Sequence, residues 1–369
     1  KRFTEFYKQG LVYLANDRWF FKTTAFAATM IRLLKNDYIS FVPGSWADDC
    51  LAWLDEVGDR CVSGTEGTGI AVPAYCCHSC GEITVTERVP GVCGHCDGVG
   101  FNPAAGFLSG AFVSALVAMA EVEKLRDAED QSCFYPLSLV TAGVDTVFPG
   151  ILFFLSAGGG PGNSHPALEV LVNGQVRWKT GQETEILKKH GTDALRFALA
   201  MQAAPGREVP LSLNRVNGFI PFFNKLWNAA RFVLKKLEES GPDMNKPGSG
   251  EIPEPGVDDL PDTGKWILHA LNNTVEKVND RLDNYRVHEA AALAYRFFLQ
   301  DFCGWYLEFA RGDLAAWNAD GNRSRTAVLE TLRYVLATLL KLLHPFIPFI
   351  TEEIYRQLGG GGFLLQKEY

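Results

Sequence analysis

This sequence contains no long apolar run and fewer positive than negative charges. No apolar run reaches the ~18 residues that a membrane-spanning helix needs, so no membrane partner is expected. The 369 residues hold 35 Lys and Arg against 43 Asp and Glu, which gives a formal net charge of −8. That balance argues against binding nucleic acid or an anionic membrane through bulk charge, although a local basic face remains compatible with it.

The sequence also opens without a signal peptide and contains no recognisable hydrolytic centre. It starts with helix-like character and ends on a glycine run and a polar tail, which we interpret as the sign of a fragment. The expected location is a reducing intracellular compartment, either the mitochondrial matrix or the cytoplasm. The seven histidines are scattered, and no Ser-His-Asp or paired-carboxylate arrangement is present, so no catalytic residue is assigned.

Five of the nine cysteines fall between Cys76 and Cys96. Cys77 and Cys80 form one Cys-x-x-Cys pair, and Cys93 and Cys96 form a second pair after twelve intervening residues. Two pairs at this separation can place four thiolates around a tetrahedral Zn²⁺, so they predict a zinc ribbon over residues 73–100. Four thiolates fill the coordination sphere of zinc, and the metal is therefore expected to hold shape and not to activate water.

Other residues near these pairs are interpreted as neighbours of the metal. Cys76, His78 and His95 lie inside the cluster but are not expected to be ligands. Gly81 and Gly94 are expected at the two knuckles, because glycine suits tight backbone turns. The alternatives to a metal site are a pair of disulfides or buried free thiols, but the remaining cysteines show no disulfide-like pattern.

The chain divides into two regions of different sequence pattern. Residues 1–213 mix short helical and strand-like runs with many glycines, which is typical of an α/β domain with insertions. Residues 214–358 carry apolar residues at helical spacing and predict an all-α bundle. Helices are expected within 214–240 and over about 262–285, 287–311, 323–343 and 347–358, with 359–369 as a tail.

The helical half contains the stretches FNKLWNAARFVL (223–234) and HPFIPFITEEIY (344–355), and between them the long helical run 282–311. Further stretches follow upstream at 17–22, 39–63, 73–96, 134–145 and 190–200. Together they resemble class I aminoacyl-tRNA synthetases, and valyl-tRNA synthetases most closely. The resemblance implies a Rossmann-like catalytic domain with a zinc ribbon, then an anticodon-binding helical bundle. It also implies tRNA as the partner and ATP-dependent valine–tRNA ligation as the family's activity.

The sequence departs from this family where ATP would be handled. The cationic family motif "KMSKS" should precede HGTDALRF, but the stretch there is shorter, and Arg177 and Lys179 are interpreted as the cations nearest to the position of the motif. The family's "LDTWFSS" aligns with residues 108–114, which read LSGAFVS and lack its acid and its tryptophan. Since such groups position the substrate and stabilise phosphate charge, their loss predicts loss of aminoacylation, and ATP is not expected as a cofactor. Gly143 and Asp145 are interpreted as a remnant of the nucleotide site.

Two sets of polar residues in the bundle are candidates for RNA contact, as the resemblance implies. The first set is Arg215, Asn224, Lys225, Asn228 and Arg231, and the second is Lys277, Arg281 and Arg286. The alternative is a solvated helix face. Residues 214–369 hold 18 Lys and Arg against 20 Asp and Glu, so the bundle lacks the basic excess of a dedicated RNA binder.

Three hypotheses follow for the function. The first is a catalytically inactive relative of valyl-tRNA synthetase that serves as a structural or RNA-associated subunit of a larger complex, for example an organellar ribosome or its assembly machinery. The second is an active valine–tRNA ligase of which this chain is a fragment. The third is a regulatory module that binds tRNA without catalysis.

Overall fold

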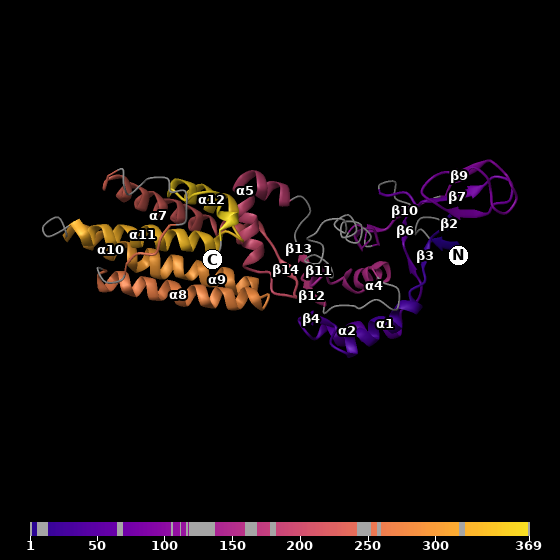
Figure 1. Cartoon of the computed structure of the whole chain (residues 1–369), viewed down its shortest axis with the longest axis horizontal. Coiled ribbons are helices and arrows are strands. Elements are labelled where there is room, and N and C mark those ends of the chain that lie inside the picture. The colour runs from indigo at the N-terminus through magenta and orange to yellow at the C-terminus, as the bar shows by residue number, and fades with distance from the viewer. Residues whose placement is uncertain are drawn as a thin grey trace. The chain divides into compact units, whose positions relative to one another are not determined.

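The structure of the protein is a computed structural model, which describes most of the chain. The described residues are 2–5, 14–64, 69–104, 106–110, 112–115, 117, 137–158, 168–177, 182–241, 252–256, 260–316 and 322–367. The chain divides into two compact units, Lys1–Val172 and Asn173–Tyr369, which are coloured from indigo to magenta and from pink to yellow in Figure 1. The first unit is mixed α/β and the second is mainly helical, as the sequence predicts.

A small sheet with covering helices forms the core of the first unit. Its strands run in the order β11 (Leu139–Gly143), β12 (Leu168–Asn173), β4 (Ile39–Val42), and β12 pairs with β4 in parallel. Alternation along β12 buries Leu168, Val170 and Val172. Helices α1 (Thr24–Lys35), α2 (Trp46–Asp55) and α4 (Val147–Gly158) pack with this sheet and share one apolar core with it.

Short strand pairs make up the rest of the first unit. Antiparallel pairs join β1 (Arg2–Glu5) to β2 (Leu14–Asp17), β3 (Phe20–Phe21) to β5 (Arg60–Cys61), and β6 (Ser63–Gly64) to β10 (Phe107–Leu108). A three-stranded antiparallel sheet contains β8 (Ile83–Val85), β7 (Ala74–Cys77) and β9 (Phe101–Pro103), in that order. This last sheet carries the first cysteine pair.

The helices of the second unit match the predicted bundle closely. They are α6 (Leu213–Asn217), α7 (Ile220–Glu238), α8 (Asp262–Asp283), α9 (Val287–Arg296), the π-helical stretch η2 (Phe297–Tyr306), α10 (Leu307–Ala316), α11 (Asn322–Leu343), α12 (Pro348–Gln357) and the short η3 (Leu364–Gln366). The expected helix over 287–311 is therefore continuous but changes to π geometry in its middle. No helix among the described residues is long and apolar enough to cross a bilayer.

Helix α11 is the centre of the bundle. It contacts α7, α8, α9, α10 and α12. Its apolar residues are buried on several sides, including Leu332, Leu336 and Leu340. Because this one helix touches five others, its leucines hold the bundle together through apolar burial.

The second unit begins at Asn173, earlier than the change of sequence pattern at 213/214. It also contains β13 (Val176–Arg177), which pairs in parallel with β14 (Val209–Pro210), and helix α5 (Gln182–Ala200), which kinks at Gly191. Helix α5 contacts α6, α9 and α12. Residues 173–177 and 182–213 therefore belong to the same compact unit as the bundle, whereas the boundary at 213/214, drawn from the change in pattern, stays a prediction.

An acidic side chain of α5 caps α12. The carboxylate of Asp193 accepts hydrogen bonds from the backbone N–H groups of Phe349 (3.3 Å) and Ile350 (2.8 Å). Helix α12 has no side-chain cap from the residue that precedes it, Ile347. Beside this cap, the Arg196 guanidinium donates to the carbonyl oxygens of Pro345 and Phe346. Two charged side chains of α5 thus fix the start of α12.

We expect Asp193→Ala to lower the free energy of unfolding by about 1–2 kcal/mol, because the first turn of α12 loses its acceptor. Chemical denaturation followed by circular dichroism would measure this change. Asp193→Asn is the matched control, since an amide oxygen can still accept one of the two hydrogen bonds. Equal stability of wild type and Asp193→Ala would show that the cap contributes nothing.

Candidate functional site

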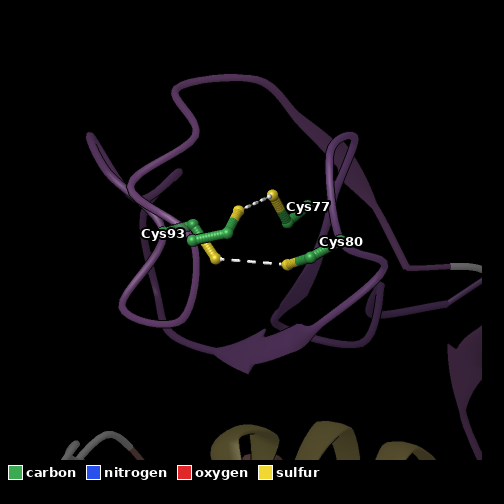
Figure 2. A group of neighbouring side chains, drawn as sticks. Cys77, Cys80 and Cys93 are labelled. Atoms are coloured by element: carbon green, nitrogen blue, oxygen red, sulfur yellow. Dashed lines mark hydrogen bonds between the residues drawn. The ribbon is translucent and has the colours of Figure 1, made fainter.

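Four sulfur atoms meet at one point of the first unit. The Sγ atoms of Cys77, Cys80, Cys93 and Cys96 all lie within 4.8 Å of one another. Cys77 and Cys96 are 3.6 Å apart, and so are Cys80 and Cys93. Figure 2 shows the side chains of Cys77, Cys80 and Cys93 converging from two loops of the ribbon. The structure therefore brings together the four residues that the spacing singles out as metal ligands.

The two cysteine pairs are held by the same backbone pattern. In the first knuckle, the N–H of Gly81 donates to the Cys77 carbonyl, and the N–H of Cys77 donates to the carbonyl of Glu82. In the second knuckle, the N–H of Asp97 donates to Cys93, and the N–H of Cys93 donates to Gly98. Each first cysteine thus bonds to the residues four and five positions later. The repeat explains why the two pairs present their thiols alike.

The two knuckles use different residues at the left-handed position. Gly81 has a φ of 73°, in the left-handed region where glycine is favoured. At the matching position of the second knuckle stands Asp97, with a φ of 55°. Gly94 lies in the turn of the second knuckle, three residues before this left-handed position. Aspartate tolerates this geometry better than most residues, so glycine is not required there.

Two thiols of the cluster have pKa values shifted in opposite directions. Backbone N–H groups of Cys80 and Ser79 lower the pKa of the Cys77 thiol to about 6. For Cys80, the lowering effect of the Glu82 backbone is outweighed by Cys96, burial, Cys93 and Cys77, which raise its pKa to about 12. Cys77 therefore ionises more easily than Cys80, whose thiol is held protonated by hydrogen bonds within the cluster. A divalent cation bound by the four sulfur atoms would favour their thiolate forms.

Neighbouring donors lie outside the sulfur cluster. The thiol of Cys76 donates to the carbonyl of Gly81 at 3.4 Å. Neither Cys76, His78 nor His95 belongs to the group of mutually close donors. The backbone at Gly100 lies close to the His78 ring, since a Cβ added to Gly100 would come within 2.7 Å of the His78 Nδ1 atom. We therefore still interpret Cys76, His78 and His95 as neighbours of the four-cysteine cluster and not as part of it.

Three residues of the first RNA-contact set gather at one hollow. Asn224, Lys225 and Asn228 on α7 line an open groove of about 670 Å³. Lys189 and His190 at the end of the first half of α5 form its other wall. Arg215 lies elsewhere and its guanidinium donates to the side chain of Gln202. Arg231 occupies an exposed position further along α7 and does not line the groove.

The second RNA-contact set is partly neutralised within the protein. Arg281 and Arg286 both form ion pairs with Glu289. Burial acts to raise the pKa of Glu289, but the hydrogen bond from Arg286 and the two positive charges hold it below its usual range. Lys277 is exposed on α8. The assignment of this set to RNA stays a prediction, and the Glu289 network weakens it.

Gly143 and Asp145, which the sequence analysis interprets as a remnant of the nucleotide site, lie at the end of a strand. Gly143 is the last residue of β11, and Asp145 lies in the turn between β11 and α4. The N–H of Thr146 donates to the Gly143 carbonyl at 3.0 Å and closes this turn. Of the cations expected to replace the cationic family loop, Arg177 pairs with Glu208 at 2.5 Å, whereas Lys179 lies outside the described residues.

A second hollow beside α7 contains residues that the sequence did not single out. Its lining includes Lys189 on α5, Trp227 on α7 and Phe349 on α12, which belong to three different helices. The one signal that the sequence offers is Trp227, which stands among polar residues of α7. Nothing local indicates that α5 and α12 face that helix.

Residues 264–369 match the family described as the anticodon-binding domain of tRNA ligase. A valine–tRNA ligase of Geobacter sulfurreducens is 34% identical over 354 residues, which is 93% of this chain. This chain is homologous to valine–tRNA ligases. A Thermotoga maritima valine–tRNA ligase is 33% identical over 358 residues. The homologous region spans 39% of the length of each of these relatives.

Solved structures show the same fold for the valine–tRNA ligase homologue. A Mycobacterium tuberculosis methionyl-tRNA synthetase bound by methionyl-adenylate aligns over 94% of this chain and 64% of its own, with a TM-score of 0.62 and 16% identity. A protein chain from the Agrobacterium radiobacter LeuRS-tRNA-LeuAMS ternary complex also aligns, over 84% of this chain and 42% of its own. The TM-score is 0.58 and the identity is 14%. At this level of identity the likeness establishes the class I synthetase fold alone.

Proposed function

We propose that this chain binds tRNA through its helical bundle and does not form valyl-adenylate. The observation that carries the proposal is the bundle itself, because residues 264–369 match an anticodon-binding domain and fold into α8 to α12. Helices of this kind hold structured RNA through its backbone and its unstacked bases. The groove beside α7, lined by lysine and amide side chains, supplies donors for such contacts.

The loss of catalysis is supported by residues inside the chain. Ser109 and Gly110 stand where the resembled family has an acid and its neighbour, and they cannot supply a carboxylate to a substrate. Arg177, which replaces part of the cationic loop, is occupied by Glu208. Activation of an amino acid by ATP depends on positioned groups that stabilise phosphate charge, so these changes remove much of what the reaction needs.

We also propose that the four-sulfur cluster holds a structural Zn²⁺. Its chemistry supports this, because Cys₄ sites with two Cys-x-x-Cys knuckles suit tetrahedral zinc and leave no open position. Cys77, Cys80, Cys93 and Cys96 would all act as thiolates. The bound metal would fix the two knuckles against each other and take no part in a reaction. A zinc–thiolate site requires reduced cysteines, which fits a reducing compartment.

A further part of the proposal is that the chain is a subunit of a larger assembly. Apolar side chains are exposed on the small ribbon, including Ile83, Val85 and Val99. Exposed apolar side chains that adjoin one another in a patch are typical of a protein contact. Affinity purification of the tagged chain from its own cells would test this. Recovery without stoichiometric partner proteins would reject the subunit role.

Two assays on the same preparation test the main proposal. A gel-shift titration with a tRNA-Val transcript is expected to show binding. Valine-dependent exchange between ATP and pyrophosphate is expected to stay at the level of a no-protein control. The alternative function is valine–tRNA ligation, which the 34% identity along the chain favours. Exchange activity above background would establish that alternative and overturn the proposed loss of catalysis.

A further inference from the structure

Two close sulfur contacts cross the four-cysteine cluster, and both join one knuckle to the other. Cys77 of the first knuckle lies 3.6 Å from Cys96 of the second, and Cys80 lies 3.6 Å from Cys93 (Figure 2). The bond between two sulfur atoms of a disulfide is about 2.05 Å long, so a small side-chain rotation brings either pair together. The cluster is therefore arranged for two disulfides as well as for a metal ion.

Each close contact joins an exposed cysteine to a buried one. Cys80 and Cys96 are exposed, whereas Cys77 and Cys93 are only 2% and 1% exposed. A small oxidant in the solvent therefore reaches one sulfur atom of each pair first. The other sulfur atom is shielded from the oxidant but lies beside the one that reacts. Cysteines that respond to peroxide combine the same two features, an accessible sulfur and a resolving cysteine next to it.

Other cysteines in the described part of the chain are less suited to this chemistry. Burial raises the pKa of the Cys50 thiol and of the Cys303 thiol to about 12, so both stay protonated at neutral pH and react slowly. Cys76 adjoins the cluster, but its thiol donates to the Gly81 carbonyl and is not one of the four clustered sulfurs. Oxidation is therefore expected to affect the cluster before these three thiols.

We propose that the four-cysteine cluster is a peroxide-sensitive modification site, which oxidation converts into two disulfides that cross between the knuckles, Cys77–Cys96 and Cys80–Cys93. The exposed sulfur of each pair attacks hydrogen peroxide as its thiolate, the form in which a structural zinc would hold it. The O–O bond breaks, an S–O bond forms, and this sulfur is oxidised to a sulfenic acid while hydroxide leaves and is protonated to water.

The buried sulfur of the same pair completes the reaction. It attacks the sulfenic sulfur, so that an S–S bond forms and the S–O bond breaks. The hydroxide that leaves takes up a proton and becomes the second water. Each disulfide therefore consumes one peroxide and yields two waters. The protons come from the thiols, or from solvent where the sulfurs begin as thiolates.

Oxidation exchanges one restraint on the ribbon for another. The sulfur atoms of a disulfide lack the thiolate charge that zinc requires, so the metal is released. Two disulfides that cross between the knuckles then hold them together in its place. Disulfides in a reducing compartment are mostly transient and redox-sensing, so reduction is expected to restore the thiols. Only the release of metal rests on the structural zinc proposed above, because the pairing rests on the positions of the sulfurs.

Trypsin separates the two knuckles and so reports how the cysteines pair. It cleaves after Arg60, Arg88 and Lys124, which places the first knuckle on peptide 61–88 and the second on peptide 89–124. Disulfides within the knuckles leave the two peptides separate. Disulfides between the knuckles join them into one species, which mass spectrometry of a non-reduced digest detects.

The experiment treats the purified wild-type chain with hydrogen peroxide, alkylates the remaining thiols and then digests the protein. We expect most of peptides 61–88 and 89–124 to be joined, with fragment spectra that place the links at Cys77–Cys96 and Cys80–Cys93. A colorimetric chelator is expected to record the release of about one Zn²⁺ per chain. Dithiothreitol with added zinc is expected to reverse both changes.

Cys76→Ser is the matched control for the pairing. Cys76 lies on the same tryptic peptide as Cys77 but outside the cluster, so its loss is expected to leave the yield of joined peptides unchanged. Loss of the joined species in Cys76→Ser would show that the wrong cysteine had been assigned.

Limited trypsin digestion tests whether the disulfides replace the metal. Protein stripped of metal by a chelator under reducing conditions is expected to be cut between Ala74 and Pro103. Peroxide-treated protein is expected to resist cleavage there, although it holds no metal either. Equal cleavage of the two samples would show that the oxidised cluster does not hold the ribbon, which overturns the exchange of restraints.

The results distinguish this proposal from the zinc site. If peroxide releases zinc but the two peptides stay separate, the pairing across the knuckles is overturned and the zinc site stands. If both zinc and the four thiols survive peroxide, the cluster is not a modification site and the proposal fails. If the joined peptides form in a chain that never held zinc, the zinc proposal fails and the pairing stands.

Discussion

Replacing Cys77 by serine is expected to reduce bound zinc from about one ion per chain to none, because serine offers no thiolate to complete a tetrahedral site. Structural zinc contributes an apparent ~10–16 kcal/mol at neutral pH, far more than this small ribbon can gain from burial. The hairpin of β7 and β8 exposes Ile83 and Val85 and has little core of its own. Without metal, we expect the region between Ala74 and Pro103 to become the first site of proteolytic cleavage.

Cys76→Ser is the matched control for this experiment. Cys76 precedes Cys77 directly, but its thiol bonds to the Gly81 carbonyl and is not one of the four clustered sulfurs. Zinc content measured by a colorimetric chelator, together with limited trypsin digestion, reads out both effects. Full zinc content in Cys77→Ser, or equal loss in Cys76→Ser, would falsify the assignment of ligands.

Phe197→Ala is expected to destabilise the second unit by about 3–5 kcal/mol, the range for removing a large buried aromatic ring. Phe197 lies on α5 and is fully buried. Its ring stacks on that of Phe222 at 5.0 Å between centroids. The rings of Phe219, Phe223 and Tyr295 surround it at 5.1, 6.1 and 5.8 Å. Truncation leaves a cavity among four other rings that cannot all close in on it.

The same variant tests whether α5 belongs with the bundle. Phe197 joins α5 to α7 and α9, so its loss is expected to expose α5 to protease before the rest of the bundle unfolds. Phe363→Ala is the control, because Phe363 is 66% exposed and its truncation should change stability by less than about 0.5 kcal/mol. Guanidinium unfolding followed by circular dichroism measures both variants. A loss below about 1 kcal/mol in Phe197→Ala would show that α5 packs loosely.

The four-cysteine cluster could be found from the sequence because its geometry is local. Each knuckle closes through hydrogen bonds that span at most five residues, so the spacing of the cysteines already implies how their thiols are presented. The second knuckle shows the limit of that reasoning. Gly94 lies in its turn, but the left-handed position falls at Asp97, because the backbone pattern counts from Cys93 and not from the nearest glycine.

The charge of the RNA-contact candidates could not be judged from the sequence. Arg281 and Arg286 fall on a predicted helix and the start of the next, where they look available to a phosphate. In the fold they meet at Glu289, which offsets part of their charge. Helical periodicity places residues on a face, but it does not say which charges from other turns share that face.

By itself the sequence determined the class of the fold, the five main helices of the bundle and the four clustered cysteines. These depend on periodicity and short spacings, which act within a few residues of the chain. Only the tertiary structure decided that α5 packs with the bundle and that α5, α7 and α12 enclose a groove. The cap from Asp193 to Ile350 joins residues 157 positions apart. Contacts at such separation arise when buried faces pack together, and no local pattern encodes which faces will meet.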